Sequence, residues 1–168
     1  ILTATANEHY VFVNWTKGED VVAETAEYTF TVEADVELVA NFRHVASTIN
    51  AHPNDGENGV LAWFISQAHA GDTVILADGE YIQEGSLTFD KPGLVIMAAE
   101  NAKPVIKSGS YAQHYATTTI IGVTFDGKFS EEKQAEHGIY SYENTSKNLT
   151  LINCEFRNYE NYLLTCSS

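Results

Sequence analysis

An acidic and a basic residue occupy matching positions in two similar segments of the last third of the chain. Asp126 and Arg157 hold the same place in segments 119–127 and 150–158, which lie 31 residues apart. If neighbouring strands carry them, they lie about 4.8 Å apart. Arg157 could then neutralise a uronate carboxylate while Asp126 or Glu155 holds calcium, which acidifies the C5 proton for β-elimination. Alternatively, Asp126 and Arg157 form a structural ion pair worth less than ~1 kcal/mol.

His137 is a second candidate, since histidine changes charge near neutral pH. Beside Asp126 it could act as a general base, and the alternative is a loop histidine bonded to a backbone carbonyl. The other histidines are too scattered to suggest a metal site. Calcium held by Asp and Glu is compatible with so acidic a chain, but no Asp-x-Asp-x-Asp loop localises it. The sequence therefore predicts no cofactor with certainty.

Tyrosines cluster in the last third of the chain, at positions 111, 115, 140, 142, 159 and 162. Aromatic faces stack on sugar rings, and the candidates for carbohydrate contact are Tyr140, Tyr142 and Tyr159. The alternative is that about half of the cluster packs between strands, because tyrosine is a good strand former.

The charge balance excludes several partners. The 168 residues include 9 Lys and Arg against 23 Asp and Glu, a formal net charge of −14. A phosphate backbone needs a basic stripe, so nucleic acid is excluded as a partner. No apolar run approaches the ~18–20 residues of a spanning helix, so membrane insertion is not expected. With 44% hydrophobic residues, the chain is nevertheless expected to fold.

An internal repeat indicates how the candidate residues are positioned. In both similar segments an apolar residue precedes a kink, at Gly122 in one and Asn153 in the other, and two apolar residues spaced two apart follow it. Gly and Asn tolerate a left-handed backbone. A repeated left-handed bend between strands predicts a parallel β-helix, with Val123 and Phe125 pointing inward and Asp126 outward. The polar insertion 128–137 accounts for the length of the repeat and marks a side where ligands often bind.

The preceding chain supplies the start of such a solenoid. In 59–68 the apolar residues recur at i, i+3, i+4 and i+7, which predicts a short helix with Gly71 just beyond its end. Short strands are expected from residue 73 onward, separated by Gly, Pro, Asp and Asn turns. Residues 44–58 have the composition of a linker.

Residues 1–43 are expected to form a separate β-module. Tyr28, Phe30 and Val32 alternate with polar residues, which predicts a half-buried strand. A second short strand is expected over 37–42, with Trp15 as the core anchor. The order of the aromatic residues, Asn14-Trp15, a glycine turn and Ala40-Asn41-Phe42 resembles the divergent internalin-type B-repeat over residues 2–42, apparently lacking its first strand. That resemblance implies a spacer or adhesive stalk on a bacterial surface or secreted protein.

The helix followed by Gly71-Asp72 and the run from Thr73 to Tyr81 resembles the entry to the pectate-lyase-like right-handed parallel β-helix superfamily. The resemblance covers residues 58–168 and implies that the helix caps the first coil. The superfamily includes lyases, hydrolases, epimerases, phage tail proteins and inert adhesins, so it leaves open whether the protein is an enzyme. Catalytic Lys and Arg of related lyases are expected on later coils and are not transferred to this chain.

The predicted protein is therefore all-β, with a B-repeat-like module at 1–43, a linker at 44–58 and the N-terminal coils of a β-helix with one capping helix at 59–168. The expected function is that of a secreted or cell-surface, carbohydrate-associated protein. A polysaccharide lyase with active coils beyond Ser168, a glycoside hydrolase, and an adhesin or phage-like stalk remain alternatives.

Two expectations concern the end of the chain. The residues around Leu164 carry almost no charge, so we expect self-association through the C-terminal coil. Cys154 and Cys166 are expected to be buried thiols, although a single bridge between them is not excluded by the sequence.

Overall fold

The computed structural model describes residues 1–53, 57–141 and 147–166, and for Cys166 only the backbone. Two compact units make up the chain, Ile1–Ala46 and Ser47–Ser168. Both consist mainly of β-strands, and the described part contains one short helix, α1 (Val60–Gln67). The predicted all-β fold class is therefore confirmed.

The first unit is a small antiparallel β-module. Strand β2 (Tyr10–Lys17) lies between β3 (Asp20–Ala23) and β5 (Val39–His44), while β1 (Leu2–Thr3) pairs with β4 (Glu27–Tyr28). Trp15 is 8% exposed, and its indole N–H donates a hydrogen bond to the Ala26 carbonyl at 3.3 Å. Trp15 therefore anchors the module, as the sequence predicts.

The strand predicted from Tyr28 to Val32 is wrong beyond its first residue. Strand β4 ends at Tyr28, and Val32 is 69% exposed. The alternation correctly places Tyr28 and Phe30 together, since their rings stack at 5.3 Å. However, no neighbouring strand pairs with residues 29–38 in the described part of this unit, so no hydrogen-bonded ladder forms.

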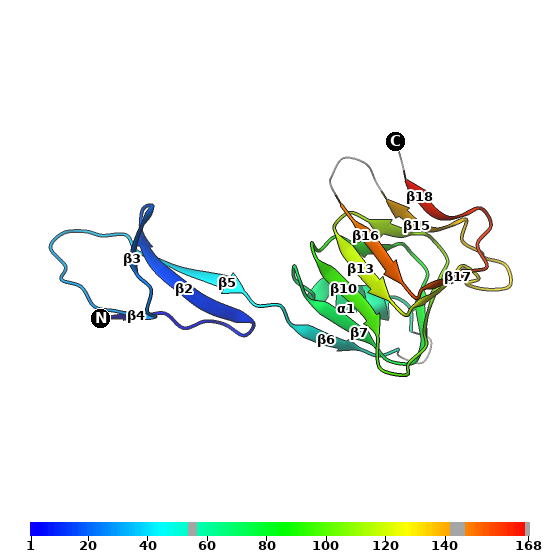
Figure 1. Cartoon of the computed structure of the whole chain (residues 1–168), viewed down its shortest axis with the longest axis horizontal. Coiled ribbons are helices and arrows are strands. Elements are labelled where there is room, and N and C mark those ends of the chain that lie inside the picture. Colours follow the sequence, from blue (N-terminus) through cyan, green and yellow to red (C-terminus); the bar gives the residue numbers. More distant parts are fainter. Residues whose placement is uncertain (54–56, 142–146, 167–168) are drawn as a thin grey trace. The chain divides into compact units, whose positions relative to one another are not determined.

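The second unit is a parallel β-solenoid with three sheets (Figure 1). One sheet contains β6 (Thr48–Ala51), β7 (Thr73–Leu76), β10 (Leu94–Ala98), β13 (Thr118–Ile121) and β16 (Leu149–Ile152). The next contains β8 (Gly79–Gln83), β11 (Pro104–Ser108), β14 (Thr124–Asp126) and β17 (Glu155–Arg157). The last contains β9 (Leu87–Phe89), β12 (Ala112–His114), β15 (His137–Ser141) and β18 (Tyr162–Cys166). Each successive set of three strands forms one coil.

The predicted repeat is confirmed residue by residue. Ile120 pairs in parallel with Leu151, and Phe125 pairs with Phe156. The two kinks are equivalent, because Gly122 has φ 70° and Asn153 has φ 52°. Both lie in the left-handed region, which turns the chain sharply between the first and second sheets of a coil.

Columns of inward side chains form the core. Val74, Ile96 and Ile120 are in register on three successive coils and are fully buried. In the next sheet the Phe125 and Phe156 rings stack at 4.8 Å with an interplanar angle of 5°. Parallel in-register pairing thus places apolar residues of successive coils on one another, and these columns form the core.

The linker expected over 44–58 requires a correction. Residues 48–51 form β6, which pairs in parallel with β7, and the compact units divide between Ala46 and Ser47. Residues 54–56 lie outside the described part of the chain. Polar and turn-forming residues concealed a strand whose buried residues are only Ala51 and, in part, Ile49.

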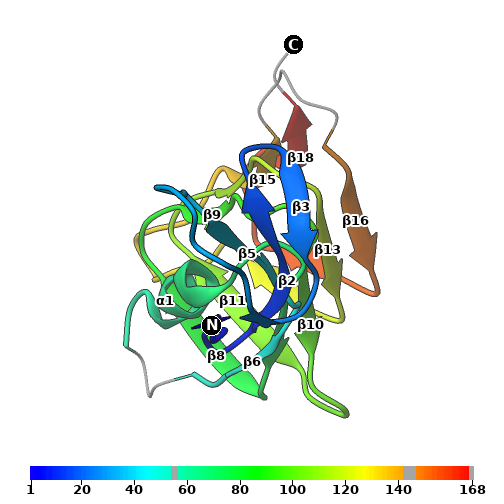
Figure 2. The same ribbon diagram turned by 90° about the vertical axis from the view of Figure 1, so that its left-hand side faces the viewer.

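The predicted capping helix is present. Leu61, Phe64 and Ile65 of α1 belong to the same buried cluster as the coil residues, and α1 packs against β8 and β9 of the first complete coil (Figure 2). The helix ends at Gln67, where Ala68 becomes extended. Gly71 (φ 82°) therefore belongs to the turn before β7 rather than to the helix end.

Substitution of Asn153 tests the left-handed corner. The Asn153 side chain is exposed, so its backbone conformation dominates the effect of a change. We expect Asn153→Val to lower the free energy of unfolding by about 1–2 kcal/mol, and Asn153→Gly to preserve it. Thr150→Val, at an exposed position of β16, is the control and should have little effect in chemical denaturation. Equal stability of both Asn153 variants would contradict the assigned corner.

Candidate functional site

The predicted Asp126–Arg157 pair forms between the last two coils. Arg157 Nε donates to Asp126 Oδ2 at 2.9 Å, Asn158 Nδ2 donates to Oδ1 at 2.8 Å, and the Lys128 backbone N–H donates to Oδ1 at 3.0 Å. Asp126 is only 5% exposed, so the outward side of the strand on which it was expected is covered at this position. The turn after β14 and the segment after β17 both fold over its carboxylate.

Three donors keep the Asp126 carboxylate ionised. Burial alone would raise its pKa, but the hydrogen bonds from Asn158, Lys128 and Arg157 outweigh burial and lower the pKa below its ordinary value of 3.8. An ionised carboxylate that accepts three N–H bonds is suited to joining coils. The geometry thus favours the structural alternative for this pair, and a catalytic role for Asp126 and Arg157 stays a prediction.

Glu155, the other calcium candidate, lies on the surface beside the same arginine. Its carboxylate is 3.9 Å from Arg157 Nη1 and its side chain is 61% exposed. The structure therefore brings Asp126, Glu155 and Arg157 together, with the cation already between the two acids. Calcium at Asp126 and Glu155 would have to compete with Arg157 for both carboxylates.

His137 lies elsewhere, at the start of β15. Its Nε2 is 3.7 Å from the Glu136 carboxylate, and its Nδ1 is 3.5 Å from the Thr165 hydroxyl. Its described polar contacts do not include Asp126, so the expected pairing of those two residues is not observed. Glu136 is the acid beside this histidine.

Aromatic rings surround His137. The Tyr162 ring stacks on it at 5.7 Å with an interplanar angle of 5°. The Tyr111 and Tyr140 rings both lie at 6.4 Å from it and 5.6 Å from each other. We call these four residues the aromatic cluster. Tyr162 is 63% exposed, so part of the cluster faces solvent.

The aromatic cluster borders a cleft of about 500 Å³. Tyr111, His137 and Tyr140 of the aromatic cluster line it, together with Gln134 and Glu136 of the insertion. This volume falls within the range of small-ligand sites. That the insertion marks a side where ligands bind stays a prediction.

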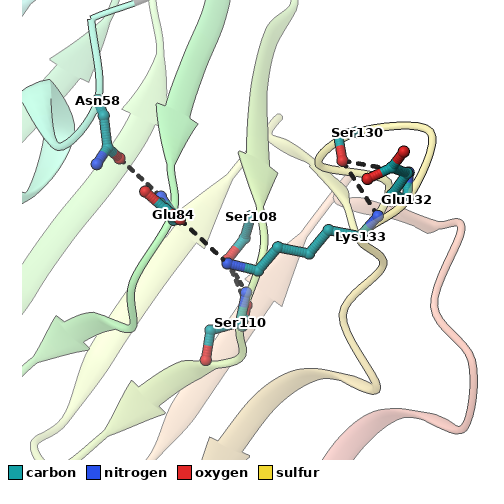
Figure 3. Close-up of polar contacts among 7 residues, drawn as sticks. All are labelled: Asn58, Glu84, Ser108, Ser110, Ser130, Glu132 and Lys133. Carbon is teal, nitrogen blue, oxygen red and sulfur yellow. Dashed lines mark hydrogen bonds and ion pairs between the residues drawn. The ribbon is translucent and has the colours of Figure 1, made fainter.

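Lys133 holds the insertion against earlier coils (Figure 3). Its ammonium lies 3.5 Å from the Glu84 carboxylate, at a separation of 49 residues in the chain, and 5.2 Å from the centre of the Phe129 ring. The Lys133 stem passes over Gly109, where a Cβ atom would lie 2.8 Å from Lys133 Cε. Gly109 thus permits the close approach that fixes one wall of the cleft.

The candidate Tyr159 does not line the cleft. Tyr159 packs against the core beside Phe156, with ring centres 6.4 Å apart, and burial raises its pKa. Tyr159 therefore matches the alternative in which tyrosines of this group pack in the protein. Tyr142 lies outside the described residues. Tyr111 and Tyr162 belong to the tyrosine group in the sequence but were not singled out as candidates. Both are members of the aromatic cluster around His137.

Comparisons with known proteins agree with this description. Residues 1–46 match the family model of the Divergent InlB B-repeat domain, which confirms the resemblance seen over 2–42. No curated protein matches the sequence. The chain is similar to a solved structure described as a PL6 family alginate lyase, AlyGC, with a TM-score of 0.61 and 24% identity over 87% of this chain and 20% of that one. This likeness shows a shared β-helix fold, and the chain spans about a fifth of that lyase.

The described residues contain no helix that is long and apolar enough to cross a membrane.

Replacing Asp126 tests its role in joining the coils. We expect Asp126→Asn to lower the free energy of unfolding by about 2 kcal/mol at neutral pH, because a buried charge-assisted network is lost. The folded-state pKa is lowered, so this stabilisation is present above the unfolded-state pKa and is lost as the pH falls through the folded-state value. The difference between wild type and variant should therefore shrink below about pH 4.

The matched control is Asp90→Asn, because the Asp90 side chain is 49% exposed and, in the described part of the chain, forms an ion pair with its neighbour Lys91. This change should have almost no effect. Urea denaturation at several pH values measures both variants. A stability difference for Asp126→Asn that does not change with pH would contradict the assignment.

Proposed function

We propose that residues 47–168 bind polysaccharide in the cleft beside the aromatic cluster, and that the chain belongs to an extracellular, carbohydrate-associated protein. The observation that carries the proposal is the grouping of Tyr111, Tyr140 and Tyr162 around His137 at a cleft of about 500 Å³. The carbon–hydrogen face of a sugar ring is apolar and packs on the negative face of an aromatic ring. Tyrosine hydroxyls, His137 and Glu136 offer hydrogen bonds to sugar hydroxyls.

Two comparisons support the wider setting. The B-repeat match at residues 1–46 favours a spacer or adhesive module on a secreted or bacterial cell-surface protein. The alginate lyase with the same fold acts on a polysaccharide according to its description. We also assign the β-helix, on these grounds, to the pectate-lyase-like superfamily.

A polysaccharide lyase is the second candidate, favoured by the likeness to the PL6 family alginate lyase. In that case the eliminating residues are proposed to lie on coils beyond Ser168. Within the described residues Asp126 and Arg157 bind each other, which leaves neither group positioned as a separate base or neutraliser. We therefore favour binding without elimination for this segment.

We further propose that the last coil mediates self-association between two copies of the chain. Leu164 pairs with Ile139 of the preceding coil, so it continues an inward column, yet it is 51% exposed. Tyr162 and Leu163 are exposed on the same strand. An apolar strand of this kind favours contact with a second copy.

Binding to immobilised polysaccharides tests the proposed cleft. We expect Tyr140→Ala to weaken binding to a polysaccharide that retards the wild-type chain by about tenfold, which corresponds to 1.4 kcal/mol. Tyr115→Ala is the control, because Tyr115 is partly exposed on the same unit but does not line the cleft. Affinity electrophoresis measures both variants. If the polysaccharide retards wild type and Tyr140→Ala equally, the proposal that it binds in this cleft is refuted.

Elimination is tested separately. We expect no ultraviolet-absorbing unsaturated product from alginate, pectate or chondroitin sulfate in the presence of calcium. Product above a heat-inactivated control, abolished by Arg157→Ala in a folded variant, would instead support the lyase candidate.

A further inference from the structure

A second cleft, of about 640 Å³, lies at the helix that caps the β-helix. Phe64 of α1 contributes a side chain that is only 9% exposed. Two rings stand at steep angles to it: Trp63, with ring centres 5.0 Å apart and an interplanar angle of 75°, and His52, at 5.4 Å and 64°. The cleft is therefore lined by a buried aromatic ring and by two rings in edge contact with it.

Packing of the helix does not account for Trp63. The residues of α1 that face the core are Leu61, Phe64 and Ile65, and Trp63 lies off this face with 59% of its surface exposed. An exposed indole costs free energy in water, since a large apolar surface stays hydrated. The exposed Trp63 ring lines the cleft, where it is available to pack on the apolar face of a ligand.

The rest of the cleft is polar. Glu57 and Asn58 line it. The Asn58 Oδ1 accepts a hydrogen bond from the Glu84 backbone N–H at 2.7 Å, which fixes the amide, and Figure 3 shows its nitrogen pointing away from Glu84. No lysine or arginine lines the cleft in the described part of the chain. With Glu57 as its charged group, the cleft disfavours anionic ligands.

We propose that this cleft is a second carbohydrate site, which takes an uncharged pyranose ring stacked on Trp63. A sugar ring offers an apolar face for the indole together with hydroxyl groups for Glu57 and Asn58. A protein helix would match the aromatic rings but not the polar rim. Among the described residues, none lines both this cleft and the cleft at Tyr111 and Tyr140, so a variant can address each cleft alone.

The two tryptophans allow a direct test. Trp15 is 8% exposed and Trp63 is 59% exposed, so a sugar that covers Trp63 should shift the emission of the solvent-facing indole to shorter wavelength. The whole chain is titrated with cellohexaose, mannohexaose, xylohexaose and chitohexaose. We expect saturable emission changes with at least one of these neutral oligosaccharides.

Variants then assign the site by calorimetry with the oligosaccharide that binds. Trp63→Ala should weaken binding by at least about tenfold, whereas Trp63→Phe should retain part of it. Because Trp63 is exposed, Trp63→Ala should unfold at the same temperature as the wild type. Tyr140→Ala should leave this binding intact, and Trp63→Ala should leave binding at the other cleft intact, so the two proposals fail separately.

Three results would overturn the proposal: no oligosaccharide in the panel changes the emission, Trp63→Ala binds as tightly as wild type, or the emission shifts with protein concentration in the absence of sugar. The last result would identify the cleft as a contact between copies of the chain.

Discussion

Parallel stacking of one coil on the next is the constraint on which the rest of the second unit depends. A strand spacing of about 4.8 Å places each inward residue directly on its equivalent in the neighbouring coil. Ile96 can lie between Val74 and Ile120 only because all three strands keep the same register. Positions outside the core are therefore ordered as well, and residues far apart in the sequence meet at the surface.

Both clefts depend on this ordering. Tyr111 precedes β12 while His137 and Tyr140 lie on β15, and the parallel pairing of these strands brings their rings together. The insertion contributes Gln134 and Glu136 to the first cleft, and the neighbouring Lys133 passes close to the coil surface at Gly109. At the other cleft, the core contacts of Leu61 and Ile65 fix the orientation of α1 and so leave Trp63 in solvent.

The repeat and its corner could be predicted because they rest on local rules. Gly and Asn at the kink, and apolar residues two apart after it, report backbone conformation and strand alternation directly. The third sheet was harder to predict, since strands such as Ala112–His114 are too short to show a period. The strand at 48–51 was missed for a related reason, because its four residues lie among polar and turn-forming residues and are too few to show a period.

The candidate sites could be predicted only in part. The pairing of Asp126 with Arg157 followed from the repeat, but its burial did not, because Asn158 and the turn at Lys128 fold over the carboxylate. The neighbours of His137 depend on the path of the insertion, which has no periodicity. Tyr140 and Tyr159 belong to the same group of tyrosines in the sequence, yet one lines a cleft and the other packs on the core.

The central claim is that polysaccharide binds in the cleft beside the aromatic cluster. Nuclear magnetic resonance of the chain with isotope-labelled tyrosine rings tests it most directly, because each ring reports on its own surroundings. The labelled chain is titrated with an oligosaccharide of the polysaccharide that binds. The account predicts that resonances of Tyr111, Tyr140 and Tyr162 shift together with one saturation curve, while those of the buried Tyr81 and the core-packed Tyr159 stay in place. Shifts confined to tyrosines outside the aromatic cluster, or no shifts while the oligosaccharide binds, would contradict it.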